Sequence, residues 1–135
     1  MKIVVAADSD CGYIRGHDRH ISGSLIQVKI RAKEIYIVRD ENEINIGWMR
    51  FGYFWDNTPF MNMLWIDEQH RGKGAGRMVV HFWEHEMKNN GYKLMMTSTQ
   101  ANEEAQHYYR KLGYRNAGCL ILENEPMEII LTKKL

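Results

Sequence analysis

The chain of 135 residues is 44% hydrophobic, enough for one packed core but short for two, so a single domain over residues 1–135 is expected. Its 18 Lys and Arg nearly balance 17 Asp and Glu, and a formal net charge of +1 provides no general attraction to nucleic acid or anionic membranes. The two cysteines form no CxxC motif, and no segment resembles a signal peptide or a membrane span, so a cytoplasmic protein is expected.

The first third of the chain is predicted to contain a strand and two helices. Residues 2–6 form an apolar strand, and Asp8 is placed to cap an irregular helical stretch that reaches about residue 21. A second helix is expected to begin at Ser24, because apolar residues recur at near-helical spacing before the charged stretch 31–33. The residues of this apolar face are Leu25, Val28 and Ile30.

The middle of the chain is predicted to form strands. The β-rich runs 35–38 and 44–53 are separated by a short polar turn, which favours a hairpin. A further run covers residues 60–66. In 44–53 and 60–66 large apolar side chains fall on both alternating faces, so both strands are expected to be covered on both sides.

The last part of the chain alternates between helical and strand patterns. An amphipathic helix is predicted over 74–90, ended by Gly91, and a strand over 92–97. A helix is expected to begin at Asn102 and to end at Gly113, with Ala105, Tyr108, Tyr109 and Leu112 on its apolar face. Strands over 114–122 and 127–132 complete the chain. Six or seven strands with about four helices predict an α/β or α+β sandwich around one mixed sheet.

The segment 64–76 runs from a predicted strand into a helix through three alternating glycines, Gly72, Gly74 and Gly76. Glycines in this position let backbone N–H groups converge beside a helix N-terminus, which is a favourable site for an anion such as a diphosphate. Arg71, Lys73 and Arg77 add positive charge. A P-loop requires Ser or Thr after the lysine, and a dinucleotide fingerprint requires G-x-G-x-x-G; this segment has neither.

Two motifs in residues 60–115 resemble the GCN5-related N-acetyltransferase (GNAT) superfamily. Arg71, Gly74 and Gly76 match its Q/R-x-x-G-x-G/A signature between strand and helix. Downstream, Asn102, Tyr109 and the exit Leu112-Gly113-Tyr114 match its second motif. The resemblance implies a mostly antiparallel sheet with a V-shaped opening between strands 60–66 and 92–97, in which acetyl-CoA lies.

The resemblance also implies site residues. Tyr109 aligns with the family's general acid, which protonates the departing thiolate. The residues expected to bind acetyl-CoA are Trp65, Ile66, Arg71, Gly72, Lys73, Gly74, Ala75, Gly76, Arg77 and Asn102. The implied reaction is direct attack of a primary amine on the thioester, and the amine belongs to a small molecule or a protein. The enzyme is expected to be a monomer or a homodimer. A non-catalytic acyl-CoA-binding or regulatory module on the same fold is the alternative.

The base that deprotonates the amine is not identified by the resemblance, because segment 60–66 has no carboxylate. Proton removal through water is expected to involve Asp56, Glu68, His17 or Asp18. The aromatic loop before residue 60 is expected to line an acceptor pocket or to close the core, with Trp55, Asp56 and Asn62 as candidate acceptor-binding residues.

A metal site is the competing interpretation of one short motif. His81, Glu84 and His85 match the H-x-x-E-H pattern of some zinc peptidases. Both histidines are expected on the polar face of their helix, and no third ligand is evident, so we expect a solvated helix face and no bound metal.

Overall fold

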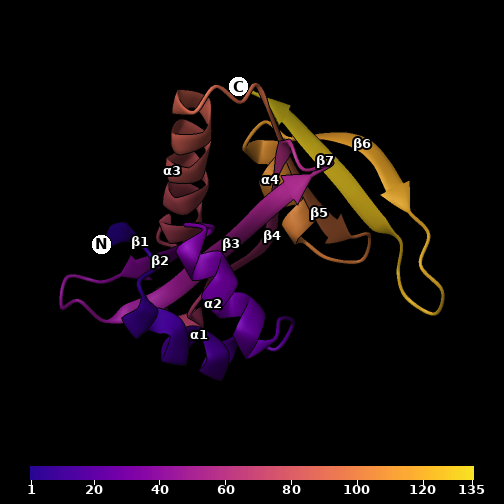
Figure 1. The fold of residues 1–135 in the computed structure, drawn as a ribbon. Helices are drawn as coiled ribbons and strands as arrows, with labels where there is room; N and C mark the ends of the chain where they lie inside the picture. The colour runs from indigo at the N-terminus through magenta and orange to yellow at the C-terminus, as the bar shows by residue number, and fades with distance from the viewer. The chain divides into compact units, whose positions relative to one another are not determined.

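The computed structural model describes residues 1–135 (Figure 1). Its seven strands form one sheet in the order β1-β2-β3-β4-β5-β7-β6. β4 and β5 are parallel, with the register pairs Phe60↔Met96 and Met61↔Thr97. The pairs β1–β2, β2–β3, β5–β7 and β6–β7 are antiparallel. The predicted mixed, mostly antiparallel sheet is therefore confirmed.

Two compact units make up the structure, one of residues 1–51 with 63–82 and one of residues 52–62 with 83–135. Three elements run through both units: β3 (Asn45–Phe54), β4 (Thr58–Ile66) and α3 (Ala75–Asn89). None of the four α-helices combines the length and apolar character needed to cross a lipid bilayer.

The first unit contains β1 (Lys2–Val5), α1 (Cys11–His17), α2 (Gly23–Arg31) and β2 (Ile35–Arg39). Alternate residues of β2 point to opposite faces of the sheet. Ile35 and Ile37 pack into a core with residues of α1 and α2, whereas the Tyr36 ring lies edge-on to Phe82 of α3. The two N-terminal helices and the first half of α3 therefore cover opposite faces of these strands.

The N-terminal helices begin and end at other residues than the sequence predicts. Asp8 does not cap; it begins a short 3₁₀ turn, and the Ala7 N–H donates instead to the Asp10 carboxylate at 2.8 Å. α1 ends at His17 because Asp18 is extended. The cap of α2 is Ser22, whose Oγ accepts from the Leu25 N–H. Asp and Ser act as caps only when their oxygens reach the first turn, which the local backbone decides.

The buried face of α2 also differs from the prediction. Ile26 and Ile30 are buried, whereas Leu25 and Val28 are 45% and 56% exposed. β3 is covered on both faces as predicted, but β4 is not, since Trp65 is 41% exposed. The β3–β4 turn has positive φ at Trp55 and Asp56, with the Asn57 N–H bonded to the Phe54 carbonyl. These dihedrals are the pattern of a type I′ hairpin turn.

α3 confirms the predicted amphipathic helix and its glycine end. Val79, Val80, Trp83 and Met87 are buried. Gly91 has φ 92°, and the N–H groups of Gly91 and Tyr92 donate to the carbonyls of Lys88 and Met87. This pair of bonds is a Schellman motif, which satisfies the last carbonyls of the helix.

The second unit contains β5 (Leu94–Gln100), α4 (Ala105–Lys111), β6 (Arg115–Leu120) and β7 (Glu128–Lys134). Ile129 and Leu131 lie on the same face of β7, and both are buried. Asn102 does not begin α4; it is exposed in the preceding turn, and Glu104 occupies the N-cap position. β6 is one of the two edge strands and is exposed along its whole length, and its register with β7 shifts between Asn116 and Gly118.

Candidate functional site

The glycine-rich loop leads from β4 into the first turn of α3. Gly72 and Gly74 have φ of 75° and 86°, a region that other residues rarely adopt. The first intrahelical bond runs from the Met78 N–H to the Gly74 carbonyl at 3.0 Å, so the N–H groups of the three preceding residues have no carbonyl partner in the helix. A Cβ on Gly72 or Gly74 would meet no atom within 4 Å. The loop is therefore an open backbone cradle suited to an oxyanion.

Arg71 is held at the start of this cradle by β4. Its Nε donates to the Ile66 carbonyl at 2.7 Å, and its guanidinium lies 4.4 Å from the centre of the Trp65 ring. Lys73 and Arg77 are exposed. The predicted cofactor residues at positions 65, 66 and 71–77 are thus brought together, and three cations accompany the free N–H groups. A phosphate-bearing cofactor fits this donor set.

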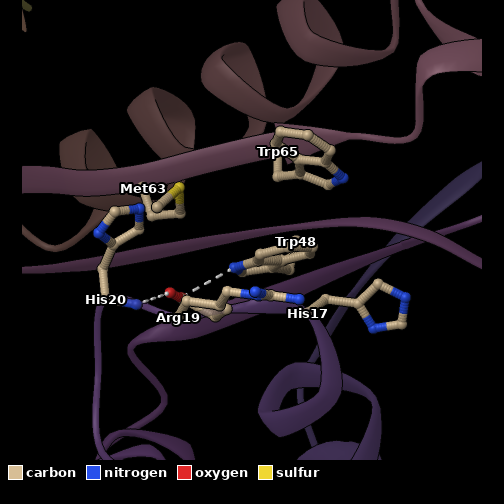
Figure 2. Close-up of a pocket in the computed structure, with 7 residues that line it drawn as sticks. His17, Arg19, His20, Trp48, Met63 and Trp65 are labelled. Atoms are coloured by element: carbon tan, nitrogen blue, oxygen red, sulfur yellow. Dashed lines mark hydrogen bonds between the residues drawn. The ribbon is translucent and has the colours of Figure 1, made fainter.

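A cavity of about 170 Å³ lies in the same unit (Figure 2). Its walls come from the end of α1, the segment that follows it, β3 and β4. The lining residues are His17, Asp18, Arg19, His20, Trp48, Met63 and Trp65. The Trp48 and Trp65 rings are 6.0 Å apart and tilted by 32°. A Cβ on Gly47 of β3 would overlap the Trp65 carbonyl, so glycine at this position allows β4 to approach closely.

Asp18 is buried in the wall of this cavity and accepts three sets of hydrogen bonds. Arg50 Nε donates at 2.7 Å, the His20 N–H at 3.0 Å and Trp48 Nε1 at 3.2 Å. Burial raises the pKa of the Asp18 carboxyl, but these hydrogen bonds and the Arg50 charge outweigh it and leave the pKa below its ordinary value. Asp18 is therefore a paired anion that holds Trp48 and the segment after α1 in place.

His17 is exposed at the same cavity and has one nitrogen engaged. Its Nδ1 lies 2.7 Å from the Tyr13 carbonyl oxygen. A carbonyl only accepts, so Nδ1 carries the proton in this contact and Nε2 of the neutral ring has a free lone pair. The ring packs 4.5 Å from the Tyr13 ring and 6.1 Å from that of Trp48. This geometry is suited to accepting a proton at Nε2.

The other candidate bases and acceptor residues lie elsewhere. Glu68 is exposed in the 3₁₀ turn after β4. Trp55, which is 79% exposed, and Asp56 form the tip of the β3–β4 turn. Asn62 lines a second cavity of about 250 Å³, in the second unit, with Tyr53, Phe54, Phe60, Ser98, Leu120 and Ile130. The three predicted acceptor residues are therefore not among those lining the cavity beside His17.

Tyr109 is buried in the second unit, and its hydroxyl donates to Met61 Sδ at 3.7 Å. Burial, with smaller contributions from Tyr108 and Glu103, raises the pKa of Tyr109 above its usual range. α4 ends in a second Schellman motif, in which the N–H groups of Gly113 and Tyr114 donate to the carbonyls of Arg110 and Tyr109. The Tyr109 and Tyr114 rings meet edge to face at 5.8 Å, so the Leu-Gly-Tyr exit also has a structural role.

The residues of the H-x-x-E-H motif do not form a common site. His81 and His85 are exposed, and Arg77 Nε donates to His81 at 3.4 Å. Glu84 is buried and accepts from the Tyr114 hydroxyl at 2.9 Å and from Lys133 Nζ at 3.1 Å. No cluster of three His, Cys, Asp or Glu side chains has the arrangement of a metal site.

Four residues that line the cavity are not predicted as site residues from the sequence: Arg19, His20, Trp48 and Met63. The polar run His17-Asp18-Arg19-His20 after a short helix is a weak signal for the first two. Trp48 and Met63 sit in apolar strand patterns, where a core role is the ordinary interpretation. Only the fold shows that they line a cavity.

Solved structures with the same fold cover nearly the whole chain. Ard1 from Thermoplasma volcanium superposes with a TM-score of 0.84 at 12% identity, over 99% of this chain and 97% of that one. The ribosomal-protein-alanine N-acetyltransferase from Brucella melitensis has a TM-score of 0.82 at 13% identity, over 100% of both chains. The yncA protein of Salmonella typhimurium, solved with its cofactor acetyl-CoA, has a TM-score of 0.81 at 17% identity, over 100% of this chain and 94% of that one.

The sequence itself matches the model of the Acetyltransferase (GNAT) family over residues 6–114, well over half of the chain. This match includes the glycine loop, α3 and both Schellman turns. The chain therefore belongs to the GNAT family of acetyltransferases.

Proposed function

We propose that the protein transfers an acetyl group from acetyl-CoA to a primary amine by direct attack of the amine. The observation that carries this proposal is the open backbone cradle at Gly72 to Arg77, in a chain of the GNAT family. A related fold, yncA, is solved with acetyl-CoA, which makes this the cofactor to test first.

The cofactor residues divide into backbone and side-chain groups. The N–H groups of Ala75, Gly76 and Arg77 are suited to the diphosphate, and the side chains of Arg71 and Lys73 add charge that screens it. Backbone groups near Trp65 and Ile66 are proposed to hold the pantetheine arm. When bound, acetyl-CoA supplies a thioester carbonyl carbon that an amine can attack.

The proton transfers are assigned to two side chains. We assign His17 Nε2 as the base that takes the proton lost by the amine, directly or through water, because its Nδ1 is fixed by the Tyr13 carbonyl. Asp18 is unsuited to this task, since its low pKa and three donors stabilise the charged form. Tyr109 is proposed to protonate the sulfur as the carbon–sulfur bond breaks, because it aligns with the general acid of the family and its hydroxyl is protonated at neutral pH.

Calorimetry with acetyl-CoA, together with CoA release in the presence of a panel of primary amines, tests the proposal. The panel includes a peptide with an N-terminal alanine, because one related fold is named a ribosomal-protein-alanine N-acetyltransferase. Binding and acceptor-dependent CoA release are expected in the wild type. Gly74→Asp is expected to abolish binding, because it places a carboxylate in the cradle at a φ of 86°. Unchanged binding in this variant would refute the cofactor site.

A non-catalytic acyl-CoA-binding module is the second candidate, favoured by one observation. β4 carries no carboxylate, so the strand offers no acidic base. Acetyl-CoA binding without acceptor-dependent CoA release, for every amine tested, would favour the module over the enzyme.

A further inference from the structure

The cavity beside His17 has the size of a single compact group. Its volume is about 170 Å³. A cavity of roughly 150 Å³ lined by apolar side chains is known to hold a benzene ring. One ring or one branched side chain is a group of the size that this cavity accommodates.

The surface of the cavity is mainly apolar. Trp48 and Trp65 provide two neighbouring indole rings, and Met63 adds a thioether beside them (Figure 2). Aromatic rings of this kind favour stacked or edge-on contacts with another ring, and a methionine side chain adapts to the remaining space. An apolar or aromatic group therefore gains favourable contacts with these side chains.

The charges around the cavity oppose a second cation in the acceptor. Asp18 is the one carboxylate among the lining residues, and Arg50, Trp48 and the His20 N–H already occupy it. Arg19 adds a positive charge to the lining. Indole faces attract cations, but the Arg71 guanidinium already lies over the Trp65 ring at 4.4 Å. An added ammonium group would find no free counter-ion here.

We propose that this cavity receives the substituent next to the reacting amine and selects a compact apolar or aromatic one over a cationic one. This inference rests on the proposed function for its link to catalysis. It narrows the acceptor class to amines that carry one ring-sized uncharged group, and it disfavours polyamines and aminoglycoside-like compounds.

The test compares three amines of similar size: phenethylamine, cyclohexylethylamine and the N-methylpiperidine analogue of phenethylamine. The last has a ring nitrogen that is protonated at neutral pH and that forms no stable amide. The kcat/KM for CoA release is expected to be at least about tenfold higher for the two amines with an uncharged ring than for the amine with a cationic ring. Equal values, or a preference for the cationic ring, would overturn the inference.

Arg19→Glu tests whether the charge at the cavity causes the preference among the three amines. Arg19 is exposed, so the fold is expected to tolerate the change, which replaces a cation at the cavity by a carboxylate. The preference for amines with an uncharged ring is expected to shrink to less than about threefold or to reverse. Arg31→Glu, at the exposed end of α2, makes the same charge change away from the cavity and is expected to leave the preference unchanged.

A binding measurement separates this inference from the proposed function. Quenching of tryptophan fluorescence in a combined Trp55→Phe and Trp83→Phe background, which leaves only Trp48 and Trp65, reports on these two rings without any turnover. Selective binding of phenethylamine without CoA release would refute the enzyme and retain the cavity's preference. Turnover with equal binding of all three amines would retain the enzyme and refute the preference. Absence of both turnover and binding would refute both.

Discussion

Asp18 and Arg50 form an ion pair whose side chains are 0% and 8% exposed. A buried carboxylate without a partner would become neutral, but here each oxygen accepts a donor. The pair therefore fixes the charge of Asp18 and anchors the segment between α1 and α2. By residue type Asp18 and His17 are equal candidates for a base, and only their hydrogen-bond partners distinguish them.

The depressed pKa of Asp18 makes this pair a pH-dependent source of stability. The carboxylate stabilises the fold fully above its unfolded pKa of about 3.9, and this contribution is lost as the pH falls through the lower folded pKa. Asp18→Asn is expected to lower the free energy of unfolding at pH 7, and the gap to wild type is expected to narrow in strongly acidic buffer. Urea denaturation at both pH values measures the gap; a constant gap would contradict the assignment.

Tyr109 contributes to the stability of the fold through one weak hydrogen bond to Met61 and through the burial of its ring. Tyr109→Phe keeps the ring, so the free energy of unfolding is expected to change by less than about 1 kcal/mol. If Tyr109 is the acid, kcat is expected to fall by roughly a hundredfold or more, with the acetyl-CoA Kd unchanged. Tyr108→Phe is the matched control, since Tyr108 is 36% exposed. Equal kcat in wild type and Tyr109→Phe would remove the acid role.

At the scale of elements, both α3 and α4 end in the same way. Gly91 and Gly113 adopt positive φ, and the next residue, a tyrosine in both cases, donates its N–H back into the helix. At α4 the following tyrosine also packs on the ring three positions before the cap. The family motif at this point is thus a structural requirement of the helix end as well as a carrier of Tyr109.

Gly113→Ala tests the importance of the Schellman motif at the C-terminus of α4. Its φ of 98° disfavours a side chain, and the added Cβ would lie 3.3 Å from Lys133 Cε, whose ammonium group pairs with Glu84. A loss of about 1–2 kcal/mol in the free energy of unfolding is expected. Gly16→Ala, in α1, has ordinary φ and open space around the new Cβ, so it is expected to be neutral or stabilising by up to about 1 kcal/mol. Equal effects would contradict the argument.

The sequence predicts most helices and strands correctly because their apolar residues follow a regular spacing over many positions. α3 and the hairpin of β2 and β3 appear within a few residues of the predicted bounds. The predicted caps Asp8 and Asn102 are wrong, since a short polar side chain suits a turn as well as a helix start. The cavity escapes prediction because its contacts are distant in sequence, as between Trp48 and Asp18.

At the scale of the molecule, two compact units share three continuous elements, β3, β4 and α3. The cradle and the cavity belong to the first unit, and Tyr109 belongs to the second. We propose that residues 1–135 nonetheless behave as one domain, because neither unit keeps its strands or its helix intact without the other's residues.

This proposal predicts a single cooperative unfolding transition. Trp83 belongs to the second unit, whereas Trp48 and Trp65 belong to the first. Trp55 also belongs to the second unit. Variants that retain tryptophan fluorescence from only one unit are the combined Trp55→Phe and Trp83→Phe and the combined Trp48→Phe and Trp65→Phe. Each is to be followed by fluorescence and by circular dichroism in urea. Within each variant the two midpoints are expected to coincide. Separate midpoints would show that the units unfold independently.

The irregular backbone of β6 affects the tendency of the protein to self-associate at high concentration. An exposed strand with unpaired backbone groups is a template on which a neighbouring chain can add a strand. The shift at Asn116 to Gly118, where Gly118 has φ 145°, breaks the even spacing that such addition needs. The irregularity is therefore expected to hinder the addition of further strands at β6, and replacing it by a regular β sequence is expected to make the protein aggregate.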